Sequence, residues 1–170
     1  DPTMKYLAQL LIAAALASSG CQSLKTTDAQ HPSAPVEEAA PGELEHAMQL
    51  WRSGNTDEAM QMYVTVASDE RTPERDLLVI HMSEDEYRAL PASEQTRVLE
   101  DWLGISRDLR IMTRAVLDTQ AASPEGDRAA RAVARVGAVH AKPERALIAQ
   151  KTGEAILREL KDRELLSSAE

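Results

Sequence analysis

Apolar side chains recur every three or four residues along most of the chain from residue 43 onward. That spacing is the period of an amphipathic α-helix, which buries one face and exposes the other. Gly54 and Asn55 separate the first two stripes. Because Gly and Asn end helices and Thr56 can cap the next one, the pattern predicts a helical hairpin. The apolar positions of this hairpin are Leu44, Ala47 or Met48, Trp51, Ala59, Met62, Tyr63 and Val66.

A third helix is predicted from Thr72 to Ile80, since Thr72 can cap it and Pro73 suits a first turn. The apolar residues 77–80 could alone form a strand. The chain offers no second strand to pair with them, so we expect helix here. Ser83 then opens a short helix through a capping box, and Pro91 closes it.

The longest element is predicted from Glu94 to Gln120, capped by Ser93. Its apolar positions repeat on average every 3.5 residues or so, the period of knobs-into-holes packing. They are Val98, Trp102, Ile105, Leu109, Met112 and Val116, with Leu99, Leu103 and Leu117 widening the stripe. Gly104 lies inside this helix and costs about 1 kcal/mol relative to Ala.

Two further helices are predicted over 129–140 and 147–165, after a turn at 123–126 and a break at Pro143. Their apolar positions are Ala129, Val133, Val136, His140, Leu147, Ala149, Thr152, Ile156 and Leu160. The predicted fold is all-α, an antiparallel bundle of about six helices over 43–166 with every apolar stripe in the core. The short turn favours pairing of the 98–116 seam within one chain, and pairing between two copies is the alternative.

The N-terminal segment has the layout of a secretory signal peptide, predicted over residues 1–20. Lys5 gives a short positive region, residues 7–17 are apolar except for Gln9, and small residues follow. The apolar stretch is shorter than the roughly 20 residues of a spanning helix. Residues 1–3 precede the expected translation start at Met4, and we interpret them as a cloning scar or as the result of a wrongly assigned start.

Ser18-Ser19-Gly20-Cys21 resembles the lipobox of bacterial lipoproteins, although Ser18 stands where that family usually has Leu. The resemblance implies a diacylglycerol on the Cys21 thiol, cleavage before Cys21, and acylation of the new amino terminus, for example with palmitate. The alternative is cleavage after Ala15-Leu16-Ala17 by ordinary signal peptidase, which releases a soluble periplasmic protein. The one cysteine of the chain lies where a lipobox requires it, so we favour the lipoprotein.

Residues 21–42 are predicted to be the lipidated cysteine followed by a flexible tether, because residues 22–42 are polar and contain three prolines. Each acyl CH₂ buried in the bilayer contributes about 0.8 kcal/mol to membrane binding, so two or three acyl chains hold a domain stably at a membrane. In the lipoprotein family the residue after the cysteine influences sorting. Gln22 in place of Asp favours the periplasmic face of the outer membrane.

Charge and composition narrow the possible partners. The net charge is −9, and an acidic surface repels phosphate backbones and anionic lipid headgroups. We therefore expect no nucleic-acid partner. Phe is absent and aromatic residues make up 3% of the chain, which suits helices with modest Ala- and Leu-rich cores. A single cysteine excludes an internal disulfide.

The 47–73 stretch resembles one tetratricopeptide repeat, a family that pairs two helices around small residues. The positions that carry the resemblance are Ala47, Gly54, Ala59, Tyr63 and Pro73. Pro73 is two residues late and no second copy follows at the family's period of about 34 residues. An ordinary helical hairpin is therefore an equal alternative. The resemblance implies a protein-binding groove, with Trp51, Gly54, Ala59 and Tyr63 as contact residues.

Patterns of catalytic chemistry are missing from the sequence: it has no nucleophile elbow, no phosphate-binding loop and no Cys/His pair. Glu43 and His46 form one Glu-x-x-His, but a di-iron site needs two. We expect no enzyme activity, no metal and no cofactor beyond the covalent lipid on Cys21.

Six arginines gather around residues 121–127: Arg107, Arg110, Arg114, Arg128, Arg131 and Arg135. Pairing with Asp108, Asp118 and Asp127 along the helices is the favoured interpretation. The alternative is a local basic face for an acidic partner or for cell-wall carboxylates.

These patterns predict a lipid-anchored protein that acts as a binding accessory or scaffold in a cell-envelope complex, of the secretion, pilus or polysaccharide-export type. A protein partner is expected on the hairpin 43–68 and on the polar edges of the 94–120 helix. One alternative is a homo-oligomeric structural lipoprotein that pairs through the 98–116 seam. Another is an unrecognised envelope enzyme. The oligomeric state stays open.

Overall fold

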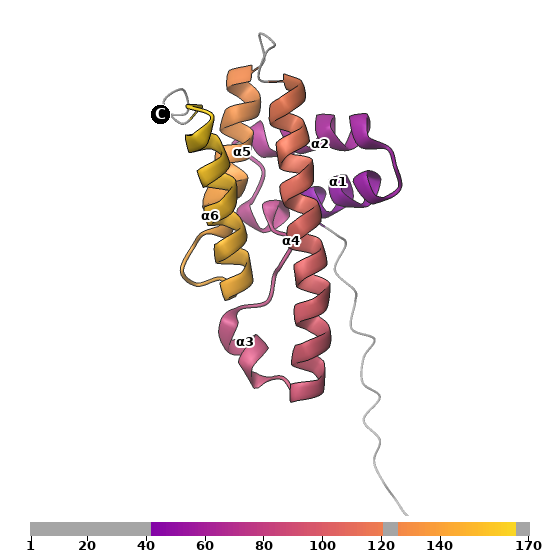
Figure 1. Cartoon of the computed structure of the whole chain (residues 1–170), viewed down its shortest axis with the longest axis vertical. Helices are drawn as coiled ribbons and strands as arrows, with labels where there is room; N and C mark the ends of the chain where they lie inside the picture. Colours follow the sequence, from indigo (N-terminus) through magenta and orange to yellow (C-terminus); the bar gives the residue numbers. More distant parts are fainter. Residues whose placement is uncertain (1–41, 121–125, 166–170) are drawn as a thin grey trace, which may run out of the picture. The chain divides into compact units, whose positions relative to one another are not determined.

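The computed structural model describes residues 42–120 and 126–165, and the regular elements of this part of the chain are all helices (Figure 1). Its elements are α1 (Glu43–Arg52), α2 (Thr56–Ser68), a 3-10 helix η1 (Glu74–Leu77), α3 (Glu84–Ala89), α4 (Ala92–Gln120), α5 (Gly126–His140) and α6 (Leu147–Asp162). These residues contain six α-helices and no strand, so the predicted all-α class is confirmed. The predicted signal peptide, Cys21 and the tether up to Pro41 lie outside the described residues.

The predicted hairpin forms from α1 and α2. Gly54 has a φ of 90°, a left-handed conformation that glycine adopts without steric cost and that reverses the chain. The Asn55 amide donates to the Leu50 carbonyl at 3.0 Å and closes the turn. Ala47 and Ala59 are both fully buried, and their small side chains let the two helices approach closely.

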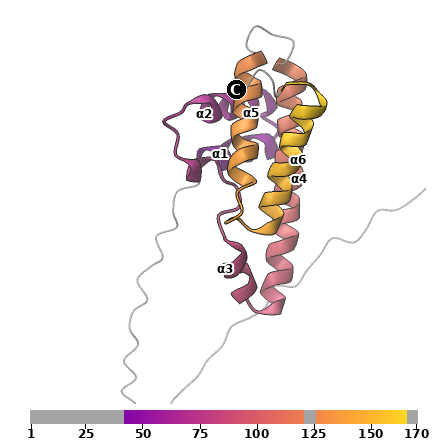
Figure 2. The same ribbon diagram turned by 90° about the vertical axis from the view of Figure 1, so that its left-hand side faces the viewer.

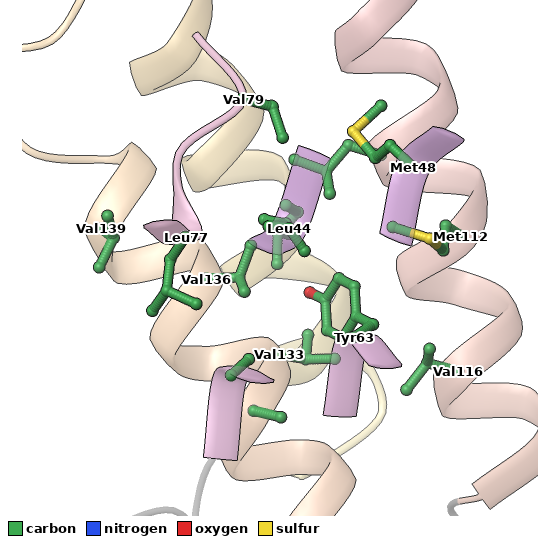
Figure 3. Close-up of a cluster of buried hydrophobic side chains, with 14 of the residues drawn as sticks. Leu44, Met48, Tyr63, Leu77, Val79, Met112, Val116, Val133, Val136 and Val139 are labelled. Atoms are coloured by element: carbon green, nitrogen blue, oxygen red, sulfur yellow. The ribbon is translucent and has the colours of Figure 1, made fainter. Parts of the chain in front are cut away.

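The predicted helix from Thr72 to Ile80 is wrong. One 3-10 turn forms at η1, and Leu78 is extended, with φ −92° and ψ 147°. Each of the four residues 77–80 is at most 4% exposed. A helix of this length would turn part of its surface outward, whereas an extended segment between other elements buries side chains on both sides. Figure 3 shows Leu77 beside Val136 and Val139 of α5.

The three long helices lie side by side, and α5 runs opposite to α4 and α6 (Figures 1 and 2). α2 packs against α5, so the hairpin covers one side of this layer. The seam residues Leu109, Met112 and Val116 are fully buried within the chain. A seam between two copies would therefore have to use other residues.

The N-terminal part of α4 extends past the start of α6 and carries α3 beside it (Figure 2). The rings of Tyr87 and Trp102 lie 5.2 Å apart and join α3 to α4. The Gln95 side chain donates to the Leu90 carbonyl at 2.7 Å, which closes the end of α3. The Glu84 carboxylate accepts from the Leu147 amide at 2.9 Å and caps the start of α6.

Three positions assigned to core stripes are instead exposed. Leu99 is 38%, Leu103 52% and Leu147 53% exposed, so the core prediction is wrong for them. The apolar surface of α4 is broader than the face that α5 and the hairpin cover. Leu103 lies outside the covered face and lines a groove beside α6.

Candidate partner-binding surface

The structure separates the four contact residues predicted from the repeat resemblance. Ala59 and Tyr63 are fully buried, Trp51 is partly buried, and Gly54 is exposed at the turn. The Tyr63 hydroxyl and the Thr113 hydroxyl share a hydrogen bond of 3.3 Å, which ties the hairpin to α4. Burial raises the pKa of Tyr63, with the Thr113 hydrogen bond opposing it. Tyr63 and Ala59 are therefore core residues of the hairpin. Of the apolar residues predicted to contact a partner, only Trp51 is accessible to one.

Replacing Tyr63 with Phe should lower the free energy of unfolding by about 1 kcal/mol, because Thr113 then loses its buried partner. The measurement is urea denaturation of the full chain. In the double variant with Thr113→Val the two losses should not add, since both remove the same bond. Fully additive losses would contradict a direct bond between the two hydroxyls.

A groove of about 440 Å³ lies between α4 and α6. Its lining residues are Leu103, Ser106, Arg107, Arg110, Ile111, Arg114, Ile148, Lys151 and Thr152. The groove therefore combines exposed aliphatic side chains with four cations. The groove is thus positively charged, although the chain as a whole has a net charge of −9.

Helix geometry brings these residues to one surface. Leu99, Leu103, Arg107 and Ile111 are four residues apart, and such a row forms one ridge along a helix. Ile111 is 48% exposed, close to the 52% of Leu103 two turns earlier. α6 contributes Ile148 and, one turn later, Lys151 and Thr152 across the groove.

The cations of the groove are held loosely. Arg114 pairs with Glu159 at 3.0 Å and Lys151 with Glu154 at 2.8 Å, and each cation's side chain is more than half exposed. Exposed pairs of this kind contribute about 0–1 kcal/mol, so carboxylates of a partner can replace the local ones. Arg110 is exposed and makes no ion pair within 42–120 and 126–165.

Ser106 contributes to the wall of the groove a hydroxyl group without a hydrogen-bond partner in the described part of the chain. Its residue is 6% exposed, and its hydroxyl has no hydrogen-bond partner among the described residues. On the opposite wall the Thr152 hydroxyl is satisfied, because it donates to the Ile148 carbonyl at 2.7 Å. A buried hydroxyl without a partner costs free energy, so Ser106 adds nothing to the stability of this wall of the groove.

Two other arginines of the predicted cluster have partners in the fold, and the first, Arg128, donates to the Ser68 hydroxyl at 2.9 Å. The Arg135 guanidinium donates to the carbonyls of Ala67, Asp69 and Thr72 and holds the chain that leaves α2. Asp118 pairs at 2.6 Å with Arg163, the residue that follows α6, so its predicted pairing along its own helix is wrong. A tertiary neighbour there lies closer than the arginines on its own helix.

The sequence prediction missed four residues of the groove: Ser106, Ile111, Ile148 and Lys151. A usable signal was the row at 99, 103 and 111, which continues beyond the width of one core stripe. The arginines at 107, 110 and 114 were recognised as a cluster, but their apolar neighbours were assigned to the core.

The described residues offer neither a membrane-spanning helix nor a metal-binding cluster. Each helix there is too short or too polar to cross a bilayer. Glu43, His46 and Glu58 line a common surface pocket. Among the described residues, no three His, Cys, Asp or Glu side chains lie close enough together to bind a metal ion. No family model matches the chain, and neither the curated proteins nor the solved structures contain a significant match.

Proposed function

We propose that this protein is a lipid-anchored adaptor of the bacterial cell envelope, which binds a protein partner in the groove between α4 and α6. Cys21 carries the lipid, the residues after it form the tether, and the helical domain presents the groove. We place it on the periplasmic face of the outer membrane, in an assembly of the secretion, pilus or export type.

One observation carries the binding role. Leu103 and Ile111 are each about half exposed on the same ridge of α4, between cations and next to Ile148. Single exposed aliphatic residues are common, but a row of them rimmed by charged residues is typical of an interaction surface. Leu109, Met112 and Val116 of the 98–116 seam are buried within the chain, which favours a different protein over a second copy as the partner.

Site-specific photocrosslinking tests the groove in the native cells. A photoreactive residue at Leu103 should give a crosslinked adduct, whereas one at Ala138, exposed on α5, should not. A third probe at Trp51 compares the groove with the hairpin surface. Adducts at Trp51 but none at Leu103 would move the binding role to the hairpin, and adducts at none of them would remove it.

Replacing Cys21 with Ser should abolish membrane retention, because the thiol that takes the diacylglycerol is gone. The measurement is fractionation of membranes, together with mass spectrometry of the mature N-terminal peptide. Ser23→Ala, two residues away, is the matched control and should stay in the membrane fraction. A wild-type peptide with an unmodified Cys21 thiol would contradict the anchor and leave the groove experiment unaffected.

A further inference from the structure

We infer that the α4–α6 groove receives an acidic amphipathic helix of the partner protein. The inference rests on the proposed function and specifies the element that binds. α4 and α6 lie next to each other and run in the same direction (Figure 1). Two adjacent helices leave a furrow along their outer side, and a further helix can pack into such a furrow through its own apolar ridge.

The apolar positions of the groove match the repeat of a helix. Leu103 and Ile111 are eight residues apart on α4, which is about 12 Å along the helix axis. Ile148 faces them from α6. A docked helix would place side chains at positions i, i+3 or i+4, and i+7 between these three residues. Long aliphatic side chains, such as Leu, fit a surface of this composition.

The charges of the groove determine which helix fits. Arg107, Arg110 and Arg114 follow one another along α4, and Lys151 faces them from α6. A helix with Asp and Glu on both sides of its apolar face would bring carboxylates to these cations. Arg110 has no ion pair within the described residues, so its charge is available without breaking an existing contact. A basic helix would be repelled.

The same observations favour a helix over an anionic bilayer. Glu154 and Glu159 lie beside Lys151 and Arg114 at the edges of the cationic surface. A flat anionic surface would meet these carboxylates together with the cations, whereas a single helix can lie within the groove between the edges. The net charge of −9 also opposes close approach of an anionic membrane.

Fluorescence anisotropy with a designed probe tests the inference. The probe is a fluorescein-labelled peptide of about 18 residues, made of Leu at helical spacing and Glu elsewhere. Its matched control carries Lys in place of Glu. We expect the full chain to bind the Glu peptide at least about tenfold more tightly than the Lys peptide, with affinity falling as salt rises.

Two substitutions locate the site. Leu103→Asp should weaken binding of the Glu peptide by about tenfold or more, because it places a carboxylate in the apolar ridge. Arg110→Glu should weaken it and reduce the preference for the Glu peptide over the Lys peptide. Arg97→Glu makes the same charge change at an exposed position of α4 outside the groove and should retain most of the affinity. Circular dichroism of each variant checks that the helices persist.

Four results would overturn the inference: no binding of the Glu peptide, equal binding of the Glu and Lys peptides, unchanged affinity in Leu103→Asp, or an Arg97→Glu loss as large as that of Arg110→Glu. Binding to phosphatidylglycerol vesicles that Leu103→Asp abolishes, without peptide binding, would assign the groove to a bilayer. A dimer of the full chain that Leu103→Asp dissociates would assign it to a second copy. Crosslinking at Leu103 without binding of the Glu peptide would refute the acidic helix and leave the adaptor function in place.

Discussion

Replacing Gly153 with Ala should lower the free energy of unfolding by about 2–4 kcal/mol, an overpacking effect. A Cβ at this position would lie 2.4 Å from the Ala141 amide nitrogen and 2.5 Å from the Gly137 carbonyl oxygen. Both are backbone atoms of the neighbouring segment, so α5 and α6 have to separate to make room. Urea denaturation of the full chain measures the loss.

The matched control for this substitution is Gly104→Ala. Gly104 also lies inside a helix, but nothing comes within 4 Å of a Cβ built there. Ala has the higher helix propensity, so this variant should gain about 0.5–1 kcal/mol. Opposite signs at the two positions show that the contact between α5 and α6 requires glycine. A gain at both positions would contradict the close approach at Gly153.

The helices themselves could be predicted from the sequence because each depends on local information. The spacing of apolar residues identifies α2, and the pair Gly54 and Asn55 marks its separation from α1. The capping box at Ser83 is present, since Glu86 accepts from the Ser83 amide at 2.7 Å. Glu86 lies three residues after the cap, so the motif can be read without knowledge of the fold.

The segment 77–80 could not be predicted in the same way. Four apolar residues in succession fit a buried helix or a buried extended chain equally well. The choice depends on which elements surround the segment, and η1, which ends at Leu77, contacts α1 and α5. Leu77, which Figure 3 shows beside Val136 and Val139, is buried against an element that is distant in the sequence.

Assignment of apolar residues to core or surface also needed the tertiary structure. Leu103 and Leu109 are both leucines of α4, yet the first is 52% exposed and the second is fully buried. The two residues lie on different faces of α4, and only one of these faces is covered by α5 and the hairpin. The sequence does not show which face is covered. Tyr63 shows the opposite error, because a residue predicted to contact a partner is inside the core.

His140 is a buried titratable group whose protonation should lower stability in mild acid. It is fully buried, and its Nδ1 donates to the Val136 carbonyl at 2.9 Å. Nε2 has no hydrogen-bond partner within the described residues. Burial lowers the pKa of His140, the nearby charges of Arg145 and His81 lower it further, and the Val136 hydrogen bond opposes them, so that the pKa is about 4.

A pKa that is lower in the folded chain means that the unfolded chain binds the proton more tightly. The contribution of His140 to stability is therefore complete above its ordinary pKa of 6.5 and declines as the pH falls toward 4. The full shift corresponds to about 3 kcal/mol, of which about 2 kcal/mol should be lost by pH 5. Glu74 and Glu159 have lowered pKa values and add their own losses at lower pH, so pH 5 isolates the histidine.

Replacing His140 with Leu should make the free energy of unfolding less dependent on pH, since Leu cannot take up the proton. Between pH 7.5 and pH 5 the variant should lose about 2 kcal/mol less than the wild-type chain. Urea denaturation at the two pH values measures both. His46→Gln removes a histidine that is exposed on α1 and should leave the wild-type loss unchanged. Equal losses in the wild-type chain and in His140→Leu would show that the ring is protonated without cost in the folded protein, and that acid acts on other groups.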